Sequence, residues 1–514
     1  MELQFLGGAT TVTGSQFLLT TSRAKVLIDC GMFQGNPHET IRNRVPLAYD
    51  PSEIDALLLT HAHLDHCGLI PSVVAQGLRA PIFATAGTVE LAGLILLDSA
   101  KLQEEAARRD ARWERRHPDR AAKESSRDEA NLAKATDEAA AADDEESTAE
   151  TRDPEVALRN QPPVVETSID EPLYTMKDAQ ATLRLFRAVG YEREFDVAPG
   201  IRATYLDAGH ILGSAIIRLR VIDREKDPER IIVFSGDLGR HNTPVIRDPT
   251  TVTEADYLLV ESTYGGREHE PQDEAVRILA ETVTLVAQAR GVLLVPSFAI
   301  GRTQEVVWQL DRLVDEKKIP RLPLYLDSPM ASKATEIYRR HSEYYDEEMR
   351  RLLAEQQDPL DYPGAQVTND IEQSRAISKA PRPYMIIASN GMLTGGRVVS
   401  HLRELIGDPA ATLLFVGYQG QGTLGAQLQA GVSPVRIDGE MHDVRCRLRS
   451  ISGFSAHADE SELLDWVRAF KRPRLRRVFI VHGDPDAQHA IEPKIRALGY
   501  DTHIPKWHER VTLE

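Results

Sequence analysis

Four side chains that can bind a metal ion occur within six consecutive positions of the chain: His61, His63, Asp65 and His66. Imidazole nitrogens and carboxylate oxygens are ligands that borderline metals such as Zn²⁺ take in proteins. In an extended segment residues i and i+2 point to the same side, so His61 and His63 can bind one cation together. If the chain then turns into a helix, Asp65 and His66 point toward a second cation nearby. The alternative for such a segment is a histidine-rich surface loop.

Three further candidate ligands lie far along the chain, each close to the end of an apolar run: His210, Asp237 and His482. Each of them alone is more often a structural residue, but together with the first cluster they complete two ligand sets. The first set is His61, His63, His210 and Asp237, and the second is Asp65, His66, Asp237 and His482. Two ions about 3.5–4 Å apart can share a hydroxide nucleophile and stabilise charge on a phosphoryl group in transfer. The sequence therefore predicts a two-metal hydroxide mechanism of hydrolysis, without a covalent intermediate.

Short apolar runs, typical of buried strands, precede most of these candidates. The runs are Lys25–Asp29, Ala56–Thr60, Ile201–Leu206, Ile231–Ser235 and Tyr257–Val260. The last four lead within a few positions to His61, His210, Asp237 and Glu261. The ends of the predicted strands thus position the polar side chains at the predicted site.

The second half of the chain has a different pattern of predicted secondary structure. Between about residues 265 and 439 strands alternate with helices, as where Gly291–Pro296 leads to Arg302–Val314 and Tyr384–Ser389 leads to Gly396–Ile406. This alternation predicts βα units in an open parallel sheet. Residues 440–514 return to strand, loop and helix, and the run Arg477–Val481 ends at His482.

The composition describes a globular chain with a strong local charge imbalance. Its 514 residues carry a formal net charge of −17, which by itself argues against a general nucleic-acid binder. Residues 128–155 hold eleven carboxylates and two basic residues, a net charge of −9 that is over half of the total. The overall charge therefore does not exclude a polyanionic substrate. Without a long apolar run or a signal-like start, and with three cysteines, we expect no membrane span and a cytoplasmic protein.

Residues 101–171 are predicted to be an insertion in a folded domain. Between Ala121 and Glu155 the only large apolar residue is Leu132, so the segment has little surface to bury. We expect either a mobile loop or a solvated, Ala-rich helical hairpin. Residues 101–120 contain Lys101 and six arginines, which are either a solvated helix face or an RNA-contacting arm.

The order of these motifs resembles a known family. Asp29, His61–His66, His210 and Asp237 together resemble the metallo-β-lactamase superfamily. Three further motifs are similar to those of its β-CASP branch, the RNA-cleaving enzymes akin to the cleavage and polyadenylation endonuclease. These motifs are Glu261 in Val-Glu-Ser-Thr-Tyr, His457 in Phe-Ser-Ala-His-Ala-Asp, and His482.

The resemblance implies an α/β fold, an αββα sandwich split by an inserted β-CASP α/β domain. The expected parts are residues 1–264 and 440–514 for the metallo-β-lactamase domain and 265–439 for the β-CASP domain. It also implies two Zn²⁺ ions held by the two ligand sets given above. Asp29 is expected to orient a ligand from outside the coordination sphere, the alternative being a simple turn residue.

Three residues are expected to take part in the chemistry itself: Asp65, Glu261 and His457. Breaking a phosphodiester bond leaves an alkoxide that needs a proton, and a histidine whose pKa is raised by a carboxylate can donate it. The resemblance pairs His457 with Glu261 in this role. The alternative is that His457 is a structural hydrogen-bonding residue at the start of a helix.

Two glycine-containing turns lead from strand to helix, and N–H groups at a helix N-terminus attract anions. Arg302 lies in the first turn, and Arg397 in the second. From composition alone, turn formation and phosphate binding are equally good explanations, and the resemblance favours the latter. The residues predicted to bind RNA phosphates are Arg302, Ser389, Gly395, Gly396 and Arg397. Tyr418 is either a base-stacking residue or a packed one.

These observations predict a zinc-dependent ribonuclease acting on RNA. Whether it cleaves as an endonuclease, as a 5′–3′ exonuclease or as both stays open, and so does the formation of a homodimer. One alternative is a DNA nuclease of the same fold, whose last motif typically lacks a histidine such as His482. Another is a small-molecule metallo-hydrolase, which would lack the inserted domain and the Glu261–His457 pair. A catalytically inactive scaffold subunit would have lost ligands, and none is missing here.

Overall fold

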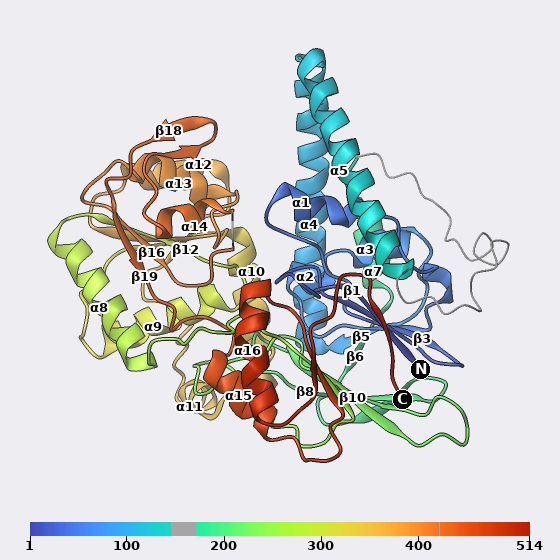
Figure 1. Cartoon of the computed structure of the whole chain (residues 1–514). Coiled ribbons are helices and arrows are strands. Elements are labelled where there is room, and N and C mark those ends of the chain that lie inside the picture. The colour runs from blue at the N-terminus through green and yellow to red at the C-terminus, as the bar shows by residue number, and fades with distance from the viewer. Residues whose placement is uncertain (145–170, 421) are drawn as a thin grey trace.

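A computed structural model describes residues 1–144, 171–420 and 422–514. Two seven-stranded sheets are built from both ends of the chain, and a six-stranded sheet from the segment between them (Figure 1). Strands predicted from the sequence occur within one or two residues of their expected bounds. The local apolar runs therefore determine where strands form.

The first sheet has the order β22-β1-β2-β3-β4-β5-β6. Its strands are β1 (Glu2–Gly7), β2 (Gln16–Thr20), β3 (Lys25–Ile28), β4 (Ala56–Leu58), β5 (Ile82–Thr85), β6 (Phe186–Val189) and β22 (Arg510–Thr512). Strands β3 to β6 run parallel to one another. The last strand of the chain, β22, pairs with the first, so the two ends of the chain close one sheet.

The second sheet has the order β21-β20-β11-β10-β9-β8-β7. Its strands are β7 (Glu194–Ala198), β8 (Ile201–Asp207), β9 (Ala215–Val221), β10 (Arg230–Phe234), β11 (Tyr257–Val260), β20 (Arg477–Ile480) and β21 (Thr502–His503). Strands β10, β11 and β20 are parallel neighbours, although β20 comes from the far end of the chain.

Apolar side chains pack between these two sheets, and helices cover the outer face of each sheet. Phe5 and Phe17 of the first sheet pack against Phe234 and Phe479 of the second. The first sheet's outer face is covered by α3 (Ile70–Ala75), α4 (Ala86–Glu114) and α7 (Met176–Leu183). The second sheet's outer face is covered by α15 (Glu460–Arg468) and α16 (Pro485–Ala497). The predicted αββα sandwich is confirmed.

The third sheet has the order β14-β13-β15-β12-β16-β19, and its neighbours are all parallel. Its strands are β12 (Val292–Pro296), β13 (Leu324–Asp327), β14 (Gln366–Val367), β15 (Tyr384–Ala388), β16 (Thr412–Phe415) and β19 (Arg447–Ser450). The larger helices around it are α8 (Gln272–Gln288), α9 (Arg302–Asp315) and α13 (Arg397–Leu405). Helices α10 (Pro329–Arg340) and α11 (Glu347–Ala354) instead contribute buried side chains to the core on the outer face of the first sheet. Shorter helices are α12 (Ile371–Ala376) and α14 (Leu424–Gln429), and β17 (Val435–Ile437) pairs with β18 (Glu440–His442).

The inserted α/β domain thus has the expected parallel architecture, but its sheet reaches beyond the expected border at residue 439. Strand β19 pairs with β16 along four residues. The motifs did not indicate this pairing because β16 lies about 35 residues earlier in the chain, and the border at residue 439 stays a prediction.

The segment predicted as an insertion contains a helical hairpin formed by α4 and α5 (Pro118–Asp144), drawn in blue and cyan at the top of Figure 1. Its helical form agrees with one of the two alternatives that the sequence left open; residues 145–170 lie outside the described part. The insertion begins and ends at one place: the backbone N–H of Leu173 donates to Gln103 (2.9 Å) and that of Met176 to Glu104 (2.8 Å). Among the described residues, no helix is long and apolar enough to cross a membrane.

Candidate metal centre

The predicted ligands meet because parallel strands end at a common edge of a sheet. Asp237, Glu261 and His482 follow the carboxyl ends of β10, β11 and β20 within one to three residues. Asp29 directly follows β3, and His61 lies shortly after β4 in the facing sheet. The site therefore lies where these ends of the two sheets face each other.

The first ligand set forms one tight group, in which His63 is half-buried and the other three residues are buried. His63 Nδ1 lies 3.1 Å from His61 Nε2 and 3.2 Å from His210 Nε2. Asp237 Oδ2 lies 3.4 Å from His61 Nε2 and 3.5 Å from His210 Nε2. One ligand atom from each of these four residues lies within 4.8 Å of the other three, which fits a single cation among them.

The second set forms a neighbouring group of Asp65, His66 and His482. His66 and His482 approach to 3.1 Å through their Nε2 atoms, and Asp65 Oδ2 lies 3.8 Å from His482 Nε2. The short helix α2 (Leu64–Cys67) carries Asp65 and His66 to this side, as expected from the turn after His63.

Asp237 reaches both groups. Its Oδ2 faces the first group, while its Oδ1 lies 3.2 Å from His66 Nε2 and 3.4 Å from His482 Nδ1. This side chain is 2% exposed, and Oδ1 makes no hydrogen bond to any residue that the structure describes. A buried carboxylate oxygen without a hydrogen-bond donor is costly, and a cation beside it would remove that cost.

Asp29 lies behind the ligands and holds one of them in place. Its carboxylate accepts hydrogen bonds from the Thr60 backbone N–H (2.8 Å) and from His66 Nδ1 (2.7 Å). This contact leaves His66 Nε2 free to face the site, the usual arrangement behind a metal-binding histidine. The orienting role of Asp29 stays a prediction, and these contacts are the reason to test it.

The electrostatics keep the first group's imidazoles neutral. Burial lowers the pKa of His61 and of His210 well below the ordinary histidine value, and the neighbouring His66 and His457, respectively, add to this effect. Burial also lowers the pKa of His63 to about 4. Neutral imidazoles are the form that binds metal ions.

His457 lies beside the ligands and faces a carboxylate. Its Nδ1 lies 3.1 Å from Glu261 Oε2, and its Nε2 lies 4.0 Å from Asp237 Oδ2. Burial favours the neutral ring, but the charge of Glu261 and the hydrogen bond to it outweigh burial and raise the pKa of His457 to about 9. Glu261 is fully buried and is fixed by the Leu238 backbone N–H, which donates to Oε1 at 2.6 Å.

One further histidine, His269, lies beside His457 and was not predicted from the sequence. His269 Nε2 donates to the backbone carbonyl of His457 (3.1 Å), and its ring packs on Tyr264 at 4.2 Å. Its Nδ1 is buried and has no hydrogen-bond partner in the described part of the chain. The next residue, Glu270, accepts from the Ser452 backbone N–H (2.7 Å) in the loop that leads to His457. The only signal in the sequence was the position of His269 eight residues after Glu261.

Several of the residues predicted to bind phosphate have protein partners. Arg302 is 5% exposed and pairs with Glu305. Arg397 donates to Asp327 Oδ1 (2.7 Å), and Ser389 Oγ donates to Ser328 Oγ (3.0 Å). Gly396 adopts φ +81°, and a Cβ there would lie 2.7 Å from the Ser389 carbonyl oxygen, so this turn requires glycine. At Gly395 none of the described residues lies within 4 Å of an added Cβ. Turn formation explains Gly396, while phosphate binding by these residues stays a prediction.

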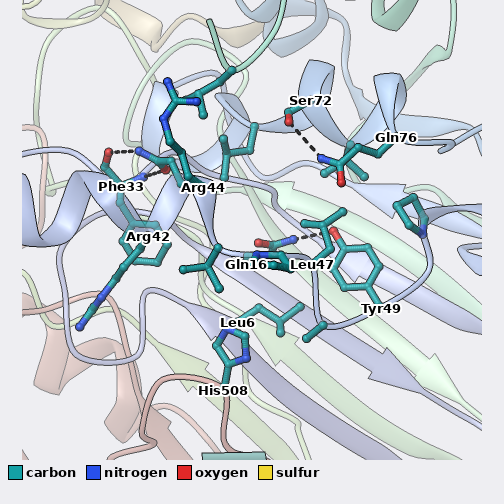
Figure 2. Close-up of a pocket in the computed structure, with 18 of the residues that line it drawn as sticks. Leu6, Gln16, Phe33, Arg42, Arg44, Leu47, Tyr49, Ser72, Gln76 and His508 are labelled. Carbon is teal, nitrogen blue, oxygen red and sulfur yellow. Dashed lines mark hydrogen bonds between the residues drawn. The ribbon is translucent and has the colours of Figure 1, made fainter. Parts of the chain in front are cut away.

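Tyr418 bridges the two domains. Its hydroxyl donates to Asp484 Oδ2 (2.8 Å), two residues after His482, and the Arg267 guanidinium lies 5.7 Å from the centre of its ring. The cavity in Figure 2 is a separate feature of about 70 Å³, lined by Leu6, Gln16, Phe33 and Tyr49 among others. None of the predicted site residues lines it.

Three family models match the chain. Residues 9–77 match the metallo-beta-lactamase superfamily, residues 303–428 the Beta-Casp domain, and residues 441–505 the Zn-dependent metallo-hydrolase RNA specificity domain. The described core of the insertion, residues 101–144, lies outside all three.

Individual proteins are similar over almost the whole chain. Ribonuclease TTHA0252 of Thermus thermophilus is 33% identical over 513 residues, which cover all of both chains. The transcription termination factor FttA of Methanosarcina mazei is 30% identical over 94% of this chain and 67% of its own length. A crystal structure of an Enterococcus faecalis protein of unknown function covers 100% of this chain and 99% of its own at a TM-score of 0.50 and 14% identity, a likeness in fold. With this similarity and the two ligand groups, the chain belongs to the β-CASP family of the metallo-β-lactamase superfamily.

Proposed function

We propose that the protein is a ribonuclease that hydrolyses RNA phosphodiester bonds with two zinc ions. The observation that carries this proposal is Asp237, whose two carboxylate oxygens face two different groups of ligands. A single-ion site would need only one of these groups. The match of residues 441–505 to a Zn-dependent metallo-hydrolase RNA specificity domain supports both the metal and the substrate.

The residues present fit two zinc ions. His61, His63, His210 and Asp237 would hold one, and Asp65, His66, Asp237 and His482 the other; imidazole and carboxylate ligands suit Zn²⁺. Two zinc ions would supply a hydroxide nucleophile at neutral pH and stabilise the charge that develops on the phosphoryl oxygens. The unsatisfied Oδ1 of Asp237 supports this occupancy.

The remaining chemistry belongs to His457. Glu261 keeps the imidazole protonated at neutral pH, and its Nε2 is directed toward the ligand groups. We therefore assign to His457 Nε2 the proton that the leaving alkoxide takes up, and to Glu261 the role of holding that proton donor in position. A positioned acid of this kind contributes about 10²–10⁴-fold to a rate.

The relatives support RNA as substrate, because one carries the name ribonuclease and others the name transcription termination factor. The three cysteines are free, which supports work in a reducing compartment such as the cytoplasm. Among the described residues, no feature of the site favours DNA or a small molecule as the substrate.

The test combines metal analysis with cleavage of matched substrates. We expect two equivalents of zinc per chain, hydrolysis of a 5′-labelled RNA and little cleavage of DNA of the same sequence. Product ladders from RNA with a 5′-hydroxyl, monophosphate or triphosphate end would distinguish internal from end-dependent cleavage. Equal cleavage of DNA, or one equivalent of zinc in a fully active protein, would contradict the proposal.

A further inference from the structure

The hairpin of α4 and α5 leaves the body of the protein halfway along α4 (Figure 1). The buried residues of α4 all lie between Gly87 and Ala100, and the rest of this helix, residues 101–114, contains no buried residue. On α5, Ala135 and Ala139 are the buried side chains among those that the structure describes. At 1.5 Å per residue, the end of α4 lies about 20 Å beyond its last buried position.

Charge is segregated along this hairpin. Its distal part, residues 108–127, contains eight basic and four acidic residues and has a net charge of +4. Residues 128–144, which return toward the body, contain six acidic residues and one lysine, a net charge of −5. A positive end is therefore carried away from the body of a protein whose overall charge is −17.

Most of the distal basic groups have no acidic partner. Arg108 pairs with Glu104, and Arg109 lies near Asp110. Among the described residues no ion pair is made by Arg112, Arg116, Arg120, Lys123 or Arg127, and all five are exposed. Their charges are therefore available to a polyanion.

The distal part offers charge and little apolar surface. The exposed large apolar side chain on the hairpin is Leu102, which lies before the distal part. Trp113 and His117 pack their rings together at 5.0 Å between the arginines. A protein partner would normally need an apolar centre to its interface, whereas phosphates need only the basic groups. Aromatic rings among basic side chains also suit the bases of a single strand.

The hairpin is firmly connected to the metal centre. The hydroxyls of Thr85 and Thr88, at the start of α4, donate to the backbone carbonyl of Gly213 at 2.6 Å and 2.8 Å. Gly213 lies three residues after the candidate ligand His210. Helix α4 therefore runs from the ligand loop to the basic end as one continuous element.

We propose that residues 108–127 form an RNA-binding arm that contacts the phosphates of a strand extending from the active site. This inference rests on the proposed function and adds a second contact region to it. The acidic part of α5 between the arm and the body would repel the strand, which confines binding to the end of the hairpin.

The experiment compares two variants with equal changes in charge. The arm variant carries Arg112→Gln, Arg116→Gln, Arg120→Gln and Arg127→Gln. The control carries Arg187→Gln, Arg193→Gln, Arg224→Gln and Lys226→Gln, four exposed positions on the body. Binding of a long labelled RNA is measured at several salt concentrations in zinc-loaded protein that also carries His457→Ala, and cleavage of a tetranucleotide is measured without that change.

We expect the arm variant to bind long RNA about ten-fold more weakly, with a slope of log affinity against log salt that is smaller by about 2–3. An arm variant with lysine in place of the four arginines should bind normally. Tetranucleotide cleavage should be unchanged, because so short a strand does not reach the arm. An unchanged salt slope in the arm variant, or an equal loss of affinity in the control variant, would overturn the proposed RNA-binding arm. So would the finding that the arm binds a protein partner and contributes nothing to RNA affinity. Failure of the proposed function would instead abolish tetranucleotide cleavage in the unmodified protein.

Discussion

At the scale of single residues, changing Asp237 tests whether the site holds one ion or two. We predict that Asp237→Ala abolishes hydrolysis and lowers zinc retention at both positions, because each carboxylate oxygen faces its own ligand group. Metal analysis of the purified variant measures this directly. Asp248→Ala, which changes an exposed carboxylate that pairs with His241, is the control. Two full equivalents of zinc with normal activity would remove Asp237 from the site.

His457 can be separated from the metal ligands by the choice of substrate. We predict that His457→Ala retains both zinc ions but cleaves RNA about 10²–10⁴-fold more slowly. The loss should shrink on a nitrophenyl phosphodiester, because a phenolate leaves without a proton. Glu261→Gln should act in the same direction but more mildly, since the imidazole remains.

The ratio of the two losses is the informative measurement for His457. An equal loss on natural and activated substrates would mean that His457 binds phosphate or supports a ligand, and the role of proton donor would have to be given up. The two-metal part of the proposal would survive that result.

His269 should act through His457, since its Nε2 donates to the carbonyl of that residue. We predict that His269→Leu slows RNA cleavage by about ten- to a hundred-fold, the cost of a small misplacement. His269→Gln can donate a similar hydrogen bond and should recover most of the rate. The nitrophenyl diester should be little affected by either change. If both variants lost activity equally on both substrates, His269 would have only a structural role.

At the scale of elements, the end of β13 shows why a predicted phosphate-binding residue has another partner. Asp327 is fully buried there and accepts hydrogen bonds from Arg397 Nη1 (2.7 Å) and His401 Nε2 (2.6 Å), both on α13. Burial alone would raise the pKa of Asp327, but the hydrogen bonds from His401, Ser374, Thr368 and Arg397 outweigh burial and lower it. The ionised carboxylate therefore joins β13 to α13.

We predict that Asp327→Asn lowers the free energy of unfolding by about 3–5 kcal/mol at neutral pH, the cost of breaking a buried pair. A carboxyl whose folded pKa lies below its unfolded value of about 3.9 stabilises the fold above that value, and the contribution is lost as pH falls through the folded pKa. Urea unfolding at neutral and mildly acidic pH should therefore show the same deficit. Asp443→Asn, at an exposed position of the same domain, should show none. A deficit that disappears between pH 8 and 5 would contradict this account.

At the scale of the whole molecule, the hairpin should be separable from the hydrolase. Its two ends meet where Gln103 and Glu104 contact Leu173 and Met176. We predict that joining Glu105 to Glu171 through a short Gly/Ser linker leaves zinc content and tetranucleotide cleavage unchanged, because few buried side chains are removed. Thermal unfolding, metal analysis and the short-substrate assay test this. Insoluble protein, or loss of zinc, would show that α5 supports the fold through its packing on residues Ile41–Arg44.

The chemical types of the ligands, their order and the strands that carry them could all be predicted from the sequence. His61, His63, Asp65 and His66 lie within a few residues of one another, so their cooperation depends on local geometry that spacing reveals. Apolar runs predict strands well because burial of a short segment is encoded within that segment. The parallel sheet of the inserted domain followed from the alternation of strands and helices.

Which residues become partners across long stretches of the chain could be learned from the folded structure alone. The pairing of Arg397 with Asp327, the contact of His269 with the carbonyl of His457, and the pairing of β19 with β16 join residues separated by 35 to 188 positions. The direction of each Asp237 oxygen toward a different ligand group depends on three strands that the fold brings side by side. Such partners are selected by packing and by the cost of leaving buried polar groups unsatisfied, and neither quantity is encoded in any one segment of the chain.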